Sequence, residues 1–361
     1  MTDGRYRSAI AAVRAFGKAG YRVIVTQTRT ESPEEPPVFQ SRFAEGRWIE
    51  GSCDDKKYAD RLYWLLAEME RPVLFCTGAA TLNAVAGQRE RFSAVCDFLI
   101  ASPKVLDQLN DKEAVHKRAL SLGLPVPAQY EGLPDRYPVV VKPHCGEKLG
   151  LKAQARYAIA ENEEEFQTIM KRMRQYDPDP LVQEKVTGAG SGASLLMDRD
   201  GRLISAICHR RIREYPYTGG PSTCCVSYYD EKQIEIARRL LASFKFTGLA
   251  MVEFKGNAIL EVNPRVWGSF PLTEAAGSPF CEHYARAAQG ETVEYTPQDY
   301  RTGTKMRFFF NDLAATLDCF RHGKVGEGFR GIADFFLCKE ALHDPKDRKA
   351  YRKYLRSYLP F

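Results

Sequence analysis

The most informative stretch of this sequence is Leu249-Ala250-Met251-Val252-Glu253-Phe254, followed after a short turn by Ile259-Leu260-Glu261-Val262-Asn263-Pro264-Arg265. Each half is an apolar run of strand length that is interrupted by one carboxylate. A carboxylate in the middle of an apolar strand is costly to bury unless a cation compensates it. Two such strands in succession therefore predict a β-hairpin built around a charged site.

The spacing of the polar residues places them on one face of this hairpin. Glu261 and Asn263 are two residues apart and share a face of their strand. Glu253 joins them only if the hairpin pairs residues whose numbers sum to an even value, such as 253 with 261. The two-residue turn that Gly256-Asn257 favours would put Glu253 on the opposite face, so we predict a three-residue loop or a β-bulge.

The resulting set suits a hard metal ion. Two carboxylates and an amide oxygen are oxygen ligands of the kind that Mg²⁺ uses while it bridges substrate phosphates. The structural alternative is a ladder of carboxylates paired with Lys or Arg. Arg265 follows at once, and its planar guanidinium suits bidentate contact with a phosphate or an acyl phosphate.

Two weaker motifs precede the hairpin. Lys142 ends the apolar strand 137–141, ahead of a loop that contains Gly146 and Gly150, and its ammonium could reach a nucleotide phosphate. The segment 183–186 (Gln-Glu-Lys-Val) runs into a glycine turn and could offer backbone groups to an adenine edge. Taken alone, each also fits an ordinary edge strand.

The order of elements indicates the architecture. The first hundred residues alternate helix-like and strand-like stretches, which predicts an open parallel α/β sheet. The sequence begins at a turn-like Asp3-Gly4, where such a domain would normally have its first strand, so we expect that strand to be missing. A single helix is expected over 104–122, and short strands around isolated helices then predict a small α+β lid and a larger α+β domain with an antiparallel sheet. We expect an N-terminal Rossmann-like domain over 1–105, a linker helix and lid over 106–186, a catalytic subdomain over 187–300 and a basic helical segment over 301–361.

Composition excludes several classes of protein. The 361 residues contain no run of about 18 apolar residues, which excludes a membrane span. The N-terminus has no signal-peptide pattern, and the ten cysteines form no Cys-x-x-Cys pair, so we expect free thiols in a cytoplasmic protein rather than structural zinc.

The basic surplus is concentrated at the end of the chain. The net charge is +6, and residues 301–361 carry 13 basic and 7 acidic side chains. A basic segment with interleaved Tyr351, Tyr354, Tyr358 and Phe361 could contact nucleic acid or a membrane surface. The same spacing is that of simple helical packing, which we favour, so neither partner is expected.

Taken together and in this order, the Lys142 strand, the 183–186 segment and the Glu253…Glu261-x-Asn263-Pro264-Arg265 signature resemble the ATP-grasp superfamily. The likeness covers roughly residues 5–290 and is greatest to the carboxylate–amine ligases of the carbamoyl-phosphate synthetase and biotin carboxylase branch. It implies the ATP-grasp fold, with an N-terminal α/β domain, a lid and a catalytic subdomain.

The resemblance also implies a role for individual residues. In the ATP site, Lys112 and Lys142 would meet nucleotide phosphates, while Glu184 and Val186 would meet the adenine. The implied ligands of Mg²⁺, or of Mn²⁺ in its place, are Glu253, Glu261 and Asn263. Arg265 would steady the transferred phosphoryl group, and Arg211 would hold the carboxylate substrate.

Several neighbouring positions complete or depart from the family pattern. The loop 219–222 (Gly-Gly-Pro-Ser) looks like an active-site loop. The lid loop 144–150 is poorer in Gly and Ser than in most members, and Gly190 stands where several relatives carry an acidic residue.

The implied reaction is phosphorylation of a carboxylate by ATP to an acyl phosphate, which an amine attacks to form an amide. Such chemistry needs positioning and charge neutralisation more than a nucleophile, so Cys145, Cys224 and Cys225 are not expected to be catalytic. Small molecules such as amino acids are the expected substrates, and a homodimer is a further expectation from the family. The alternatives are a ligase that modifies a peptide or protein terminus, and an ATP-binding pseudoenzyme.

Overall fold

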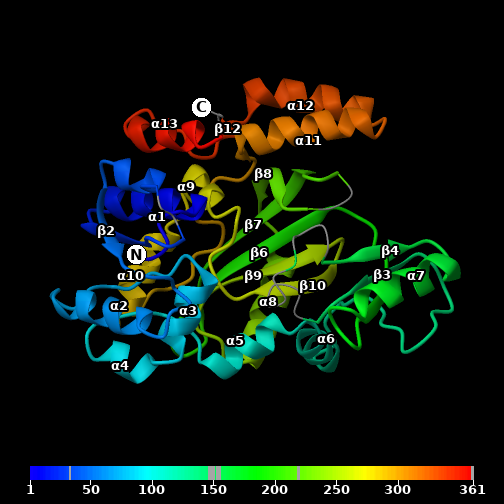
Figure 1. Cartoon of the computed structure of the whole chain (residues 1–361), viewed down its shortest axis with the longest axis horizontal. Coiled ribbons are helices and arrows are strands. Elements are labelled where there is room, and N and C mark those ends of the chain that lie inside the picture. Colours follow the sequence, from blue (N-terminus) through cyan, green and yellow to red (C-terminus); the bar gives the residue numbers. More distant parts are fainter. Residues whose placement is uncertain (32–33, 145–150, 152–155, 218–219, 359–361) are drawn as a thin grey trace.

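The computed structural model describes residues 1–31, 34–144, 151, 156–217 and 220–358 (Figure 1). The strands of these residues form three sheets, of two, three and seven strands. The helices are α1 (Arg7–Lys18), the 3₁₀ turn η1 (Pro37–Gln40), α2 (Tyr58–Ala67), α3 (Ala79–Ala86), α4 (Arg89–Ser93), α5 (Pro103–Asn110), α6 (Lys112–Ser121), α7 (Glu163–Met173), α8 (Glu231–Ser243), α9 (Pro271–Ala276), α10 (Phe280–Ala288), α11 (Phe309–Arg321), α12 (Val325–Leu337) and α13 (Arg348–Arg356). The strands are β1 (Val23–Thr28), β2 (Ala44–Ile49), β3 (Val139–Lys142), β4 (Ala158–Ala160), β5 (Leu181–Glu184), β6 (Gly190–Met197), β7 (Leu203–Glu214), β8 (Ser222–Tyr228), β9 (Gly248–Lys255), β10 (Ala258–Asn263), β11 (Lys305–Arg307) and β12 (Lys339–Glu340). Among the described residues, no helix is both long and apolar enough to cross a membrane.

The N-terminal part is built on parallel pairing, as predicted. β1 and β2 run parallel, from Val23 beside Ala44 onward. On the other side of β1, the Thr26 amide donates to the Met1 carbonyl at 2.9 Å, and the Thr2 amide donates to the Phe75 carbonyl at 3.1 Å. Residues 1–4 thus lie between β1 and the segment around Phe75, where a first strand belongs. No strand is assigned to residues 1–4, so tertiary hydrogen bonds alone fill the place of the usual first strand, and local sequence pattern does not predict them.

The linker differs from the single helix expected over 104–122. Asp111 has an extended conformation and separates α5 from α6. Its carboxylate accepts hydrogen bonds from the amides of Glu113 and Ala114, at 2.9 and 3.1 Å, and so caps α6. This break makes Lys112 the first residue of α6, at the end that faces the large sheet.

The lid is a small three-stranded sheet with one helix on it. Its strand order is β4-β3-β5, all antiparallel, and α7 packs against β3 and β4. The side chains between them form a separate hydrophobic core: Val139, Val141, Ala160, Phe166, Met170, Met173 and Val182. In Figure 1 this unit lies at the right of the view, away from the N-terminal helices.

The seven-stranded sheet has the order β10-β9-β6-β7-β8-β11-β12. Its neighbours are antiparallel, as predicted, except β11 and β12. Residues 301–361, expected to be only helical, therefore also supply two short strands at the edge of this sheet. The helices α11, α12 and α13 lie together beyond that edge, at the top of Figure 1.

Buried ion pairs fasten the C-terminal helices to the rest of the molecule. The Arg213 guanidinium on β7 contacts Asp312 of α11 at 2.8 Å and Asp334 of α12 at 2.7 Å. At the other end, Arg14 of α1 contacts Asp347 at 2.8 Å, and both side chains are 1% exposed. A buried charge is tolerated only with such a partner, so these contacts fix where the helices sit.

Candidate active site

The β9–β10 hairpin contains the predicted bulge. Lys255 pairs with Ala258 across a two-residue turn, which by itself would put Glu253 and Glu261 on opposite faces. The register shifts between Ile259 and Glu261, after which Glu253 lies directly opposite Glu261. The bulge at Leu260 therefore brings both carboxylates, and Asn263 two residues on, to one face of the sheet.

Basic side chains from two other elements meet these carboxylates. Lys112 of α6 places its Nζ 2.8 Å from Glu261 Oε2, and Arg211 of β7 forms an ion pair with Glu253. The Asn263 amide donates to Glu253 Oε1 at 3.1 Å. Each carboxylate thus has a cationic partner, as the ladder alternative expects. The two carboxylates nevertheless also face each other in one cross-strand pair, an arrangement that ion pairing alone does not call for.

The pKa values in the cluster differ sharply. Burial alone would raise the pKa of Glu261, but Lys112 and Lys142 outweigh burial and lower it to about 2. Burial raises the pKa of Glu253, and the charge of Glu261 raises it further, against the opposing effect of Arg211. Burial lowers the pKa of Lys142 to about 8, although Glu261 favours its charged form. Strongly perturbed groups gathered in one place are typical of functional sites.

Arg265 lies beside Asn263 and contacts it through both its backbone and its side chain. Its backbone amide donates to the Asn263 carbonyl at 2.9 Å, and its guanidinium donates to Asn263 Oδ1 at 3.4 Å and to the Val266 carbonyl at 3.2 Å. The structure therefore brings together six of the nine residues that the sequence singled out: Lys112, Arg211, Glu253, Glu261, Asn263 and Arg265. Lys142, 8% exposed at the end of β3, is coupled to them electrostatically.

The two hinge residues lie outside this cluster. Glu184 ends β5, and its carboxylate accepts from the Ala128 amide at 3.0 Å, while its own amide donates to the Ala128 carbonyl at 2.9 Å. Val186 is half-buried two residues later. Their contact with adenine stays a prediction, and so does the role of the lid loop, whose residues 145–150 lie outside the described part of the chain. The same holds for Gly219, whereas Gly220 is described and its amide donates to Glu214 at 3.3 Å.

Glycines on β6 make room for the basic residues of β7. Gly192 pairs with both Glu253 and His209, and a Cβ on it would lie 2.6 Å from His209 Cε1. A Cβ on Gly190 would lie 3.1 Å from Arg211 Cδ. The departure at Gly190 therefore has a physical consequence, because a side chain there would press on the aliphatic part of Arg211.

Two histidines to which the sequence assigns no individual role lie near the site. His209 is buried on the same face of β7 as Arg211, and burial lowers its pKa to about 3, so it is neutral. Its two-residue spacing from Arg211 could have indicated this position. His144 links the lid to α6, with Nδ1 3.0 Å from Asp177 and Nε2 3.1 Å from Glu113. That link joins residues far apart in the sequence, so the sequence gives no signal for it.

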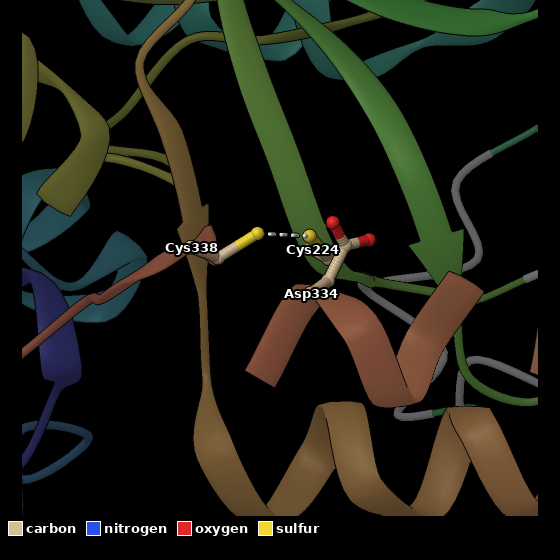
Figure 2. A group of neighbouring side chains, drawn as sticks. All are labelled: Cys224, Asp334 and Cys338. Atoms are coloured by element: carbon tan, nitrogen blue, oxygen red, sulfur yellow. Dashed lines mark hydrogen bonds between the residues drawn. The ribbon is translucent and has the colours of Figure 1, made fainter. Parts of the chain in front are cut away.

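A second group of side chains, Cys224, Asp334 and Cys338, has the composition of a metal site (Figure 2). The sulfurs of Cys224 and Cys338 are 3.8 Å apart, and Figure 2 shows them directed toward each other beside Asp334. The Asp334 carboxylate already contacts Arg213 at 2.7 Å and Lys305 at 3.3 Å. Two cations on its one carboxylate make this group a poor cation site.

The cysteines considered as nucleophiles do not fit that role. Burial raises the pKa of the Cys225 thiol to about 12, and the hydrogen bond with Cys338 together with burial raises the pKa of Cys224. A thiol with a raised pKa is a weak nucleophile at neutral pH. Cys145 lies outside the described residues.

Comparisons with known proteins agree with this geometry. A family model described as an ATP-grasp domain matches residues 109–269, which include every site residue named above from Lys112 to Arg265. No curated protein matches the chain.

Several solved structures share its fold. The biotin carboxylase domain of Hydrogenobacter thermophilus 2-oxoglutarate carboxylase, solved as a dimer with MgADP and bicarbonate, has a TM-score of 0.64 at 16% identity over 83% of this chain and 71% of its own. Biotin carboxylase from Campylobacter jejuni gives a TM-score of 0.64 at 14% identity, over 83% of this chain and 72% of its own. The L-amino acid ligase of Bacillus licheniformis gives 0.56 at 13% identity, over 79% and 72%. These structures confirm the predicted fold, and the family model supports the predicted likeness to ATP-grasp domains over residues 109–269.

Proposed function

Because the chain contains an ATP-grasp domain, we propose that it is an ATP-dependent carboxylate–amine ligase that requires Mg²⁺. ATP would transfer its terminal phosphoryl group to a substrate carboxylate, and an amine would then attack the acyl carbon and displace phosphate to leave an amide. The observation that carries this proposal is the placement of Glu253 directly opposite Glu261, with Asn263 on the same face and basic residues around them.

The donor set fits a magnesium ion. Glu253, Glu261 and the Asn263 amide oxygen would hold it, and all three are hard oxygen donors on one face of the hairpin. When bound, Mg²⁺ would neutralise charge on the nucleotide phosphates. The low pKa of Glu261, about 2, keeps that carboxylate ionised and ready to coordinate a cation at any pH near neutrality.

The basic residues would then have a second task. Lys112 and Arg211 now compensate Glu261 and Glu253, and a cation on the carboxylates would take over that compensation. Lys112 and Lys142 would then contact nucleotide phosphates, Arg265 the transferred phosphoryl group and Arg211 the substrate carboxylate. Glu184 and Val186 would hold the adenine. Phosphoryl transfer gains most from such positioned charges in a site that excludes water.

Amino acids or similar small molecules are the proposed substrates, in a cytoplasmic protein that acts as a monomer or homodimer. The likeness to an L-amino acid ligase supports this choice over a peptide or protein terminus. The complete Glu253, Glu261, Asn263 and Arg265 set argues against a pseudoenzyme. The catalytic unit would combine the lid of residues 106–186 with the subdomain of 187–300, next to the N-terminal domain of 1–105.

The test is release of ADP and phosphate with Mg²⁺ over pools of amino acids and small carboxylic acids. Turnover that depends on the pool and disappears in Glu261→Ala would support the proposal. The matched control is Glu235→Ala, which removes an exposed carboxylate of α8 and should leave turnover unchanged. No turnover with any pool despite ATP binding would favour the peptide or pseudoenzyme alternatives, and no ATP binding would refute the proposal.

A further inference from the structure

The helix α12 has its apolar residues on the outside. Its buried positions are Gly328, Gly331 and Asp334, spaced three residues apart. Its outward positions include Phe329, Ile332 and Phe336, which are 62%, 46% and 88% exposed. Val325 and Leu337, at 50% and 68% exposed, extend the same face. A surface helix of a globular protein normally shows the reverse pattern.

Packing against α11 accounts for the inner face only. A Cβ on Gly328 would lie 2.5 Å from the Phe320 ring, and one on Gly331 would lie 2.5 Å from Thr316 Oγ1. The glycines thus let α12 approach α11 closely, while Asp334 reaches Arg213. The Phe329 ring packs edge-on against the Phe320 ring of α11, with 5.6 Å between ring centroids, yet Phe329 stays 62% exposed. Phe336, at 88% exposed, projects furthest from the contact. On α11, Leu313 and Leu317 are also exposed, at 38% and 50%, and add a second apolar row.

The charges of the same region are sorted by sign. None of the seven acidic side chains of residues 301–358 is exposed, since they are buried or half-buried and several hold internal ion pairs. By contrast, ten of the thirteen basic side chains are exposed. These are Arg301, Arg321, Lys324, Arg330, Lys339, Lys346, Arg348, Lys349, Arg352 and Arg356. Six of the ten lie on α11, α12 or α13, whereas Arg301 and Lys339 lie outside these helices and donate to the Ala275 carbonyl. The acidic residues attach the segment to the molecule, and the exposed charge on these helices is basic.

We propose that the outer surface of α11, α12 and α13 binds the surface of an anionic lipid bilayer. Helices that lie on such a surface bury Phe, Leu and Ile side chains among the acyl chains while Lys and Arg contact the lipid phosphates. Each basic residue close to an anionic surface adds to the electrostatic attraction. The helices α11 and α12 pack along each other, and α13 lies at the same, upper end of the molecule in Figure 1.

Two other occupants fit the charges less well. A second copy of this chain would bring the same basic residues face to face, with no exposed carboxylate among residues 301–358 to pair with them. Nucleic acid would match the charge but would leave the aliphatic row of Val325, Ile332 and Leu337 without a function, because strand binding relies on phosphates and stacked bases.

The test is cosedimentation of the full chain with two kinds of vesicle. One kind contains phosphatidylcholine alone, and the other contains phosphatidylcholine with about 30% anionic phosphatidylglycerol. We expect binding to the anionic vesicles, weaker binding to the neutral ones, and loss at about 0.5 M salt, where surface charges are screened. The double variant F336S/L337S should bind at least about tenfold less, since two large apolar groups no longer enter the bilayer. The matched control is W64S on α2, which removes a side chain that is 64% exposed on another part of the surface and should bind like the unchanged chain.

Three results would overturn the proposal. One is no binding to the anionic vesicles, and another is equal binding by F336S/L337S with an unchanged circular dichroism spectrum. The third is that the chain does not bind vesicles but does self-associate or bind a DNA duplex, and that F336S/L337S abolishes this association. Either form of that result would assign the surface to the corresponding partner.

Discussion

Glu253 on β9 lies directly opposite Glu261 on β10, so two carboxylates share one cross-strand pair. Like charges in this position destabilise a sheet. Lys112 and Arg211, from two other elements, hold one carboxylate each, and burial still raises the pKa of Glu253. Such an arrangement costs stability, and a cation placed between the two carboxylates would offset that cost.

The first prediction concerns this pair. Glu253→Gln and Glu261→Gln should each lower the rate of ADP release by about 100-fold or more, because each removes a negative charge that would attract the metal ion. Each should also raise the Mg²⁺ concentration needed for half-maximal turnover. The measurement is a magnesium titration of turnover, with Glu235→Gln on the surface of α8 as the control. Unchanged magnesium dependence in both variants would remove these residues from the metal site.

The second prediction concerns the glycine beside this pair. Gly192→Ala would put a Cβ 2.6 Å from His209 Cε1, so the buried His209 ring must shift. We expect a loss of about 1–3 kcal/mol in the free energy of unfolding, the usual cost of overpacking. Urea unfolding measures this loss. Gly326→Ala is the control because nothing lies within 4 Å of the Cβ built there, and it should not destabilise the chain. A Gly192→Ala chain as stable as the unchanged one would show that His209 moves freely.

How much of this site the sequence predicts depends on how far apart in the sequence the interacting residues are. The bulge could be predicted, because the two-residue turn and the shared face of Glu253 and Glu261 are incompatible without it. The break at Asp111 could not, because the surrounding periodicity continues through it and only the capping hydrogen bonds reveal it. The pairing of residues 1–4 was missed for a different reason, because its hydrogen-bond partners are more than twenty residues away in the sequence. Local pattern thus predicts the carboxylate pair, and the family resemblance points to Lys112 and Arg211, while the contacts of these two residues with the pair are seen only in the structure.

The third prediction concerns Arg213, two residues beyond Arg211 on β7. Its contact with Asp312 is almost fully buried, with side chains 4% and 0% exposed. Asp312→Asn would leave the guanidinium with less compensation, and we expect the free energy of unfolding to fall by about 3–5 kcal/mol. The exposed pair of Arg238 and Glu235 offers the comparison, because Glu235→Gln should change the free energy of unfolding by less than about 0.5 kcal/mol. Equal effects of the two variants in urea unfolding would contradict the anchoring role of Arg213.

The fourth prediction concerns pH and Glu340 on β12. Its carboxylate accepts from the Phe309 amide at 3.0 Å, and burial raises its pKa to about 7, despite the opposing effect of Arg307. The folded chain therefore binds this proton more tightly than the unfolded chain, whose carboxyl titrates near the ordinary value of 4.5. It follows that the contribution of Glu340 to stability is fully present below about pH 4.5 and is lost as the pH rises to about 7.

Glu340→Gln tests the sign of this effect. Glutamine is neutral at every pH and keeps an oxygen that can accept from the Phe309 amide. Relative to the unchanged chain, the variant should gain about 3 kcal/mol in unfolding free energy between about pH 4 and pH 8. Urea unfolding at the two pH values measures this gain, with Glu235→Gln again as the exposed control. A difference between variant and unchanged chain that stays constant with pH would mean that Glu340 titrates alike in the folded and unfolded chains, and that burial at β12 does not hold its proton.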